Sequence, residues 1–170
     1  MLFRSSGTTC VIFDGNPGGS KDKPDWGTLW RYAAEEKVTF FGGGAAFFAN
    51  CMKAGVTLTP YPGLSRVRAL GTTGSPLSAE VQQWGTDEFR KVYDQAGVQA
   101  PDIWWCNISG GTDAGAFVGG LRDLPMVAGE MQCRLLGVAV EAWNEQGQPV
   151  ENEVGELVVT QPLPSMPPFF

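Results

Sequence analysis

Short apolar runs rich in β-branched and aromatic residues alternate with helix-like segments along the first two thirds of the chain. The strand-like runs are residues 9–13, 38–41, 67–70 and 103–108, and the helical periodicities between them cover 24–37, 45–53 and 78–95. Strands joined by helices pair in parallel, because a parallel connection needs a long crossover. The alternation therefore predicts an α/β fold with a mostly parallel sheet flanked by helices.

The last third of the chain has a different pattern. Residues 131–143 and 154–160 are predicted strands on either side of a turn, which indicates a C-terminal β-hairpin segment. Residues 161–170 contain too many prolines for regular structure, and the chain looks cut there rather than finished. We expect an α/β unit over residues 1–126 and a β-hairpin segment over residues 127–170 that leads to a truncated end.

Composition places the chain among soluble globular proteins. Hydrophobic residues make up 43% of the sequence and charged residues 18%, whereas disordered chains are poorer in apolar residues and richer in charge. The formal net charge of −6 argues against a nucleic-acid partner, because phosphate backbones are bound by clustered Lys and Arg. No window reaches the roughly twenty apolar residues of a membrane span. We therefore expect no membrane partner and a cytoplasmic location.

Histidine is absent from the sequence, which removes the usual general base near neutral pH and the commonest metal ligand. The four cysteines are far apart and form no Cys-x-x-Cys pair, so a zinc site is not expected. Scattered cysteines of this kind are predicted to be small buried hydrophobic side chains. Any catalytic chemistry has to proceed without imidazole.

Two predicted strands run directly into turns rich in glycine. Gly74-Ser75-Pro76 lies in the turn after residues 67–70, and Ser109-Gly110-Gly111-Thr112-Asp113 follows residues 103–108. Open α/β sheets bind ligands at the carboxyl ends of their strands. Glycines let N–H groups approach an anion, a Thr hydroxyl donates to phosphate, and a carboxylate holds Mg²⁺. The turns indicate a nucleotide site, although an isolated Gly-Gly-Thr-Asp is more often a plain turn.

These turns belong to a set of short motifs whose order and approximate spacing resemble the adenylate-forming superfamily. That superfamily includes acyl-CoA synthetases, luciferases and peptide-synthetase adenylation domains. The motifs are Gly74-Ser75-Pro76, Asn107 to Asp113, Val127-Ala128-Gly129-Glu130 and Val154-Gly155-Glu156-Leu157. Their wording is similar to the acetoacetyl-CoA synthetase branch, and the resemblance covers nearly the whole chain from Thr9 onward. It implies a Rossmann-like subdomain within the large N-terminal domain of such an enzyme.

At matching positions the resemblance implies roles for single residues. Gly74-Ser75-Pro76 corresponds to the segment that lies against adenine, and Asn107 and Ile108 correspond to residues that hold the base from its other side. Thr112 corresponds to a Thr that contacts the α-phosphate, and Asp113 to a Mg²⁺-associated carboxylate that is usually Glu in the superfamily. The predicted catalytic residues are Thr112 and Asp113, the predicted metal ligand is Asp113, and the predicted nucleotide-binding residues are Gly74, Ser75, Pro76, Asn107, Ile108, Ser109, Gly110, Gly111 and Thr112.

The resemblance also implies a reaction and its cofactors. A short carboxylic acid, acetoacetate or similar, attacks the α-phosphate of ATP in the presence of Mg²⁺ to give acyl-AMP, and the thiol of CoA then displaces AMP. Positioning and electrostatic stabilisation carry such a reaction, so no histidine is required. Ser109 and Gly110 occupy positions where acetyl-CoA synthetases carry tryptophans that shorten the acyl pocket, which implies a larger acid here.

Other parts of the superfamily pattern have no counterpart in these residues. Ser6-Gly7-Thr8-Thr9 begins like the phosphate loop but continues without its lysine and later glycines. The ribose-binding Asp, the hinge and the small domain with the catalytic lysine would follow Phe170. We therefore expect the isolated chain to be inactive. Two alternatives stay open: a non-catalytic nucleotide- or acyl-binding module, and a ligand-free scaffold that self-associates through exposed surfaces.

Overall fold

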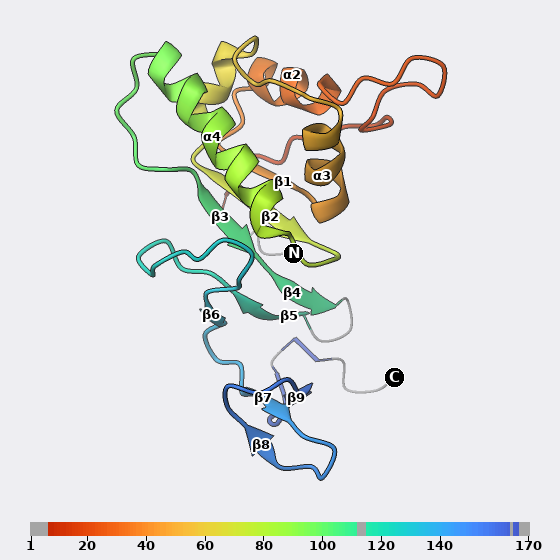
Figure 1. The fold of residues 1–170 in the computed structure, drawn as a ribbon, viewed down its shortest axis with the longest axis vertical. Coiled ribbons are helices and arrows are strands. Elements are labelled where there is room, and N and C mark those ends of the chain that lie inside the picture. Colours follow the sequence, from red (N-terminus) through yellow and green to blue (C-terminus); the bar gives the residue numbers. More distant parts are fainter. Residues whose placement is uncertain (1–6, 112–114, 164, 167–170) are drawn as a thin grey trace.

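The computed structural model describes residues 7–111, 115–163 and 165–166. These residues form three three-stranded sheets. The sheets follow one another along the long axis of the molecule, and the helices gather around the first of them (Figure 1). The chain is therefore elongated, with an α/β unit at one end and purely β structure toward the other.

The first sheet is parallel, as the alternation of strands and helices predicted. It has the order β1-β2-β3, with β1 at Phe40–Gly44, β2 at Ala69–Thr73 and β3 at Trp104–Asn107. The glycines at 42–44 were expected to end the first strand, but they belong to it. Pairing with β2 carries the strand through them, and the ring of Phe40 covers Gly71, where a Cβ atom would come 2.6 Å from Phe40 Cζ.

Three α-helices lie in the described part of the chain: α2 at Thr28–Glu35, α3 at Ala45–Lys53 and α4 at Ala79–Gln95, and a short 3-10 helix, η1, spans Pro62–Arg66. The predicted bounds of α3 are confirmed. Helix α4 begins where Ser78 caps it, because the Ser78 hydroxyl accepts a hydrogen bond from Val81 N at 3.3 Å. Helix α2 begins later than predicted, since the Asp25 carboxylate accepts a bond from Gly27 N and holds a turn there.

The three helices end with the same backbone turn. Just beyond each C-cap lies a residue with positive φ: Lys37 at 56°, Gly55 at 65° and Gly97 at 64°. In α2 the next N–H, that of Val38, donates to Ala33 O at 3.0 Å, and equivalent bonds close α3 and α4. This is the Schellman arrangement, in which glycine is usual because the left-handed conformation strains other residues. Lys37 is the exception among the three.

The hydrophobic core is rich in aromatic side chains and lies in the α/β unit. Trp30 of α2 stacks on Phe41 of β1 with ring centroids 4.5 Å apart, and Phe48 of α3 meets Trp105 of β3 edge to face at 5.2 Å. Among the described residues beyond 126, only Val140 and Leu163 are buried hydrophobic side chains. Burial is therefore concentrated in the first sheet and its helices.

The second and third sheets are antiparallel. The second contains β4 at Ser109–Gly111, β5 at Gly115–Gly119 and β6 at Cys133–Arg134, and the third contains β7 at Val140–Trp143, β8 at Pro149–Val150 and β9 at Glu156–Val159. Pairing of β7 with β9 confirms that the two C-terminal segments associate, with the short β8 between them. The single strand predicted at 131–143 is wrong, because its first part, β6, pairs with β5 and only β7 belongs to the third sheet. The β4–β5 pairing was not predicted, because Ser109 to Asp113 reads as a turn in sequence.

The prediction of a strand at residues 9–13 is wrong. These residues have no ladder partner among the described strands, and Ile12 is 80% exposed. Side-chain contacts hold the segment instead: Tyr32 Oη donates to Ile12 O at 3.0 Å, and the rings of Tyr32 and Phe13 lie 5.4 Å apart. A β-branched run without a strand beside it satisfies its backbone in other ways.

The expectation of four buried cysteines is also corrected. Cys51 is fully buried and accepts a hydrogen bond from Trp30 Nε1 at 3.3 Å. Cys106 and Cys133 are half-buried, and Cys10 is exposed. Cys10 is exposed because it belongs to residues 9–13, which do not pair with any of the described sheets.

Candidate nucleotide-binding site

The Gly74-Ser75-Pro76 turn connects β2 to the start of α4. Gly74 has φ +89°, and a Cβ atom there would meet no described atom within 4 Å. Glycine is therefore required by the backbone angle and not by a lack of space. The turn continues through Pro76 to Ser78, the cap of α4, so both of its ends are anchored in regular structure.

The carboxyl end of β3 lies beside this turn. Asn107 pairs with Thr72 in the parallel ladder, and Ile108 N donates to Thr72 O at 2.9 Å. Thr72 is two residues before Gly74, so the two predicted adenine-binding segments end neighbouring strands on the same edge. This is the place where open parallel sheets bind ligands.

The side chain of Asn107 is buried, with 8% exposure, and is only half satisfied. Its Nδ2 donates to Gln82 Oε1 at 3.1 Å and to Glu130 O at 3.2 Å. Its Oδ1 has no hydrogen-bond partner among the described residues. An unpaired buried acceptor is costly, and few occur in folded proteins. The arrangement suits a ligand that presents an N–H group to Oδ1.

The third motif, Val127-Ala128-Gly129-Glu130, joins the same cluster. Gly129 N donates to Gln82 Oε1 at 3.1 Å, and Gly129, with φ +86°, lies against Ala79 at the start of α4. Glu130 contributes its carbonyl oxygen to Asn107. Three motifs that are far apart in the sequence are thus linked through the first turn of α4.

Gln82 was not selected from the sequence, although it contacts two of the motifs. It is 2% exposed. A signal exists in the periodicity of α4, because Gln82, Thr86 and Phe89 recur at helical spacing on the buried face. A polar residue on the core-facing stripe of a helix has to find partners there, and such a position marks a candidate.

Ser109, Gly110 and Gly111 form β4, which begins two residues after Asn107. A Cβ atom at Gly110 would overlap Gly115 O and the Cα of Ala116, whereas at Gly111 it would meet no described atom within 4 Å. Close packing of β4 on β5 therefore requires glycine at position 110, independently of any role in an acyl pocket. Thr112 and Asp113 lie outside the described residues.

The predicted magnesium site rests on Asp113 and stays a prediction. Among the described residues, no group of three or more His, Cys, Asp or Glu side chains could hold a metal ion. Burial raises the pKa of the thiol of Cys106, the cysteine nearest to Asp113 in sequence.

The fourth motif, Val154-Gly155-Glu156-Leu157, is not brought to this cluster. It leads into β9 in the third sheet, at the opposite end of the molecule from the helices (Figure 1). A Cβ atom at Gly155 would lie 2.7 Å from Trp143 O. The glycine thus permits close packing on β7.

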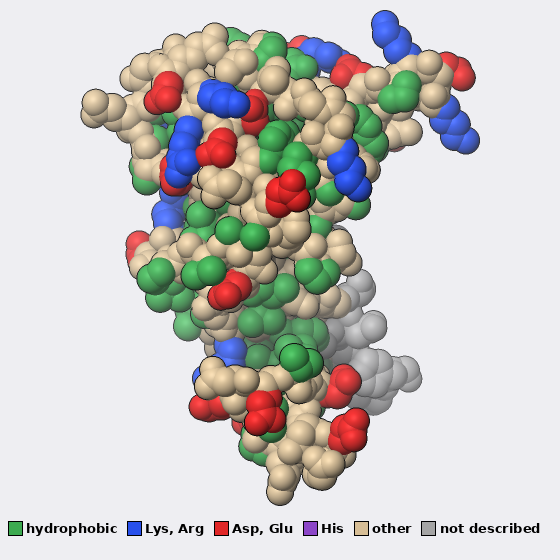
Figure 2. All heavy atoms as spheres, viewed as in Figure 1, with side chains coloured by type: hydrophobic (Ala, Val, Ile, Leu, Met, Phe, Trp, Pro, Cys, Tyr) green, Lys and Arg blue, Asp and Glu red, His purple; other side chains and the backbone are tan. Residues whose placement is uncertain are grey.

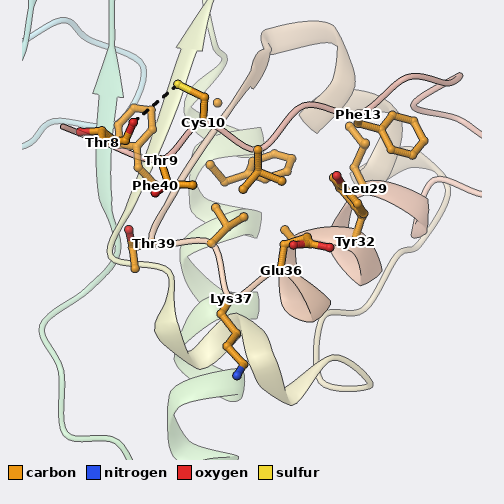
Figure 3. A pocket seen from close by; sticks show the side chains of 15 residues that line it. Thr8, Thr9, Cys10, Phe13, Leu29, Tyr32, Glu36, Lys37, Thr39 and Phe40 are labelled. Carbon is orange, nitrogen blue, oxygen red and sulfur yellow. Dashed lines mark hydrogen bonds between the residues drawn. The ribbon is translucent and has the colours of Figure 1, made fainter. Parts of the chain in front are cut away.

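A cavity of about 570 Å³ lies elsewhere, between the N-terminal segment, α2 and the edge strand β1. Figure 3 shows Thr9, Cys10 and Phe40 on one side of it and Tyr32 and Glu36 on another. None of the predicted site residues lines it. We place the candidate site at the motif cluster, because the buried polar groups converge there and not in this cavity.

The comparisons with known proteins agree with the motifs. No family model matches the sequence. The acetoacetyl-coenzyme A synthetase of Rhizobium meliloti (strain 1021) is 41% identical over 165 residues, which cover 96% of this chain and 23% of that protein. The acetoacetyl-CoA synthetase of Gallus gallus is 33% identical over 167 residues, covering 98% of this chain and 23% of its own length. The chain spans about a quarter of the length of these relatives.

Solved structures show the same relationship. The acetoacetyl-CoA synthetase from Streptomyces lividans matches with a TM-score of 0.80 and 41% identity, over 95% of this chain and 23% of that one. An anthranilate CoA ligase solved with anthranoyl-AMP matches with a TM-score of 0.65 at 17% identity, over 89% of this chain and 26% of the other. This second likeness concerns the fold alone.

Sequence identity along nearly the whole chain is thus accompanied by the same fold. The chain belongs to the adenylate-forming superfamily, in the group of acyl-CoA ligases. Within that superfamily it is related to the acetoacetyl-CoA synthetases, as the wording of its motifs predicted. In the described part of the chain, no helix has the length and apolar composition needed to cross a membrane.

Proposed function

We propose that this chain carries the adenine half of the adenylation site of an AMP-forming acid–thiol ligase. The observation that carries the proposal is the unpaired Asn107 Oδ1, a buried acceptor at the carboxyl edge of the sheet, beside the turn at Gly74. The exocyclic amino group of adenine is a donor that fits this acceptor. In the turn itself, a Cβ atom at Gly74 would meet no described atom within 4 Å, which leaves space for the face of the base.

The rest of the nucleotide follows from the course of the chain. Strand β4 leads from Asn107 toward Thr112 and Asp113, the residues proposed to contact the α-phosphate and Mg²⁺. The reaction proposed is attack of a short carboxylic acid, acetoacetate or similar, on ATP to give acyl-AMP, followed by transfer of the acyl group to CoA. This chain would bind and orient the adenylate, while the remaining groups come from parts of the enzyme outside it. By itself it is expected to be inactive.

The test is a calorimetric titration of the 170-residue chain with a non-hydrolysable acyl-adenylate mimic, with and without Mg²⁺. We expect saturable binding that is weakened roughly tenfold or more by Asn107→Leu, which removes the buried acceptor. Binding that depends on Mg²⁺ only when Asp113 is intact would support the metal assignment. The exposed Gln83→Ala, on the same helix, is the control and should bind as the wild type does. Absence of heat from well-folded protein would overturn the proposal.

A second candidate is the ligand-free interaction domain. It is favoured by the exposed hydrophobic side chains of the segment between β5 and β6, namely Leu121, Leu124, Val127 and Met131, which are 39–53% exposed. Figure 2 shows hydrophobic side chains gathered over the middle of the molecule, where this segment lies. Large exposed apolar patches mark interaction sites. Sedimentation velocity tests it: concentration-dependent self-association that Leu121→Ser/Val127→Ser abolishes supports this candidate.

A further inference from the structure

The side chain of Gln82 holds together two segments that meet at the candidate site. Its Oε1 accepts one hydrogen bond from Asn107 Nδ2 and another from Gly129 N, each at 3.1 Å. A carbonyl oxygen has two lone pairs, so both are in use. The side chain is almost completely buried, and water does not compete for these bonds.

These contacts determine which way the carboxamide of Asn107 faces. Two acceptors, Gln82 Oε1 and Glu130 O, lie at its NH₂ end. Were the amide rotated by half a turn, Oδ1 would face both oxygens without a donor, which is unfavourable in a buried place. The unpaired Oδ1 therefore points away from Gln82 and, although neighbouring atoms cover it, has no hydrogen-bond partner among the described residues.

We propose that Gln82 is a positioning residue that fixes the carboxamide of Asn107 and thereby makes the site select purines with an amino group at C6. The inference rests on the adenine site proposed above and adds the source of its selectivity. Adenine offers an N–H to Oδ1, whereas hypoxanthine presents an oxygen at the same position. With the amide held in place, the oxygen meets an acceptor and cannot be accommodated by rotation.

Two substitutions separate this role from simple packing. In Gln82→Glu the carboxylate still accepts bonds from Asn107 Nδ2 and Gly129 N, so the orientation is kept. In Gln82→Leu the acceptor is lost at similar volume, and only Glu130 O still holds the amide. The amide of Asn107 is then held by one acceptor instead of two, so it turns more easily and can donate to a hypoxanthine oxygen.

The experiment compares the affinity of the 170-residue chain for an acyl-adenylate mimic and for the matching inosine compound. We expect wild type and Gln82→Glu to prefer the adenosine compound by roughly tenfold or more, and Gln82→Leu to bring the ratio close to one. If Gln82→Leu weakens both compounds equally and keeps the ratio, Gln82 is a packing residue and the inference is overturned. Circular dichroism establishes that each variant is folded.

A ligand-free measurement distinguishes failure of the inference from failure of the proposed function. The side-chain NH₂ protons of Asn107, observed by ¹⁵N NMR, should exchange slowly with solvent in the wild type and in Gln82→Glu, and at least tenfold faster in Gln82→Leu. Equal exchange in all three overturns the positioning role even if nucleotide binds. If neither compound binds the wild type, the adenine site and its selectivity both fail, whatever the exchange rates are.

Discussion

The carboxylate of Glu88 accepts a hydrogen bond at 2.8 Å from the backbone N–H of Leu58, across two elements of the α/β unit. Glu88 is only 4% exposed. Its other oxygen, Oε1, lies 2.6 Å from Lys91 Nζ, and this contact raises the pKa of the lysine. The loop after α3 is thereby tied to the middle of α4.

Removal of this carboxylate should destabilise the fold far more than removal of the lysine. Glu88→Ala leaves the buried N–H of Leu58 unpaired and is expected to cost about 3 kcal/mol of unfolding free energy. Lys91→Met removes an exposed partner and leaves the bond of Glu88 to Leu58 in place, so it should cost below about 1 kcal/mol. Urea denaturation followed by tryptophan fluorescence measures both. Equal losses would mean that the ion pair, and not the bond to Leu58, is what matters.

Adjacent glycines in β4 should respond differently to the same change. Gly110→Ala puts a methyl group into the backbone of Gly115 and Ala116 and is expected to cost about 1–3 kcal/mol of unfolding free energy. Gly111→Ala adds a methyl group to open space and should stay within about 0.5 kcal/mol of wild type. Thermal unfolding of the pair checks this. The same overlap makes Gly110→Trp a poor probe of acyl-chain length, since it disturbs the strand itself.

Lys37 offers a substitution that should stabilise the protein. It holds φ 56° at the end of α2, a conformation that costs a residue with a side chain roughly 1 kcal/mol relative to glycine. Lys37→Gly is therefore expected to raise the free energy of unfolding by about that amount. The reverse change, Gly55→Ala at the end of α3, should lower the free energy of unfolding, because φ is +65° there. A Cβ atom at Gly55 would have no neighbour within 4 Å, so the effect comes from the backbone angle and not from a clash. A decrease for Lys37→Gly would contradict this reasoning.

Thiol labelling should rank the cysteines by environment. Burial raises the pKa of Cys51 to about 11, so at pH 8 its thiolate, the reactive form, is scarce. We expect the exposed Cys10 to react with iodoacetamide in the native protein, and Cys51 to react only after denaturation. Peptide mass spectrometry over a time course measures the two rates. Native labelling of Cys51 at the rate of Cys10 would mean that α2 and α3 open readily.

Much of the α/β unit could be predicted because its local and tertiary preferences agree. The helix from Ser78 to about Gln95 and the parallel pairing of the strands were both correctly inferred. The failures lie where distant contacts decide. Residues 9–13 have strand composition but no neighbouring strand among the described residues, and the glycines of β1 are held by pairing with β2. The strand propensity of a segment does not tell whether another strand lies beside it in the fold.

The motifs of the candidate site were recognised in the sequence, but their polar contacts were not foreseen, and nucleotide binding at the site stays a prediction. The sequence placed Gly74 and Asn107 at neighbouring strand ends, as found. The bonds of Gln82 depend on a turn that begins 45 residues later in the chain, so no local pattern contains them. The roles of Thr112 and Asp113, and the division of the chain near residue 126, stay predictions.

The uneven distribution of the core has a consequence for how the molecule opens. The third sheet contributes Val140 as its one buried hydrophobic side chain within the described strands. A region with so few buried contacts opens at lower free energy than the whole protein unfolds. Amide protons of β7, β8 and β9 should therefore exchange with deuterium well before those of β2, and a single melting temperature will describe the aromatic end of the molecule only.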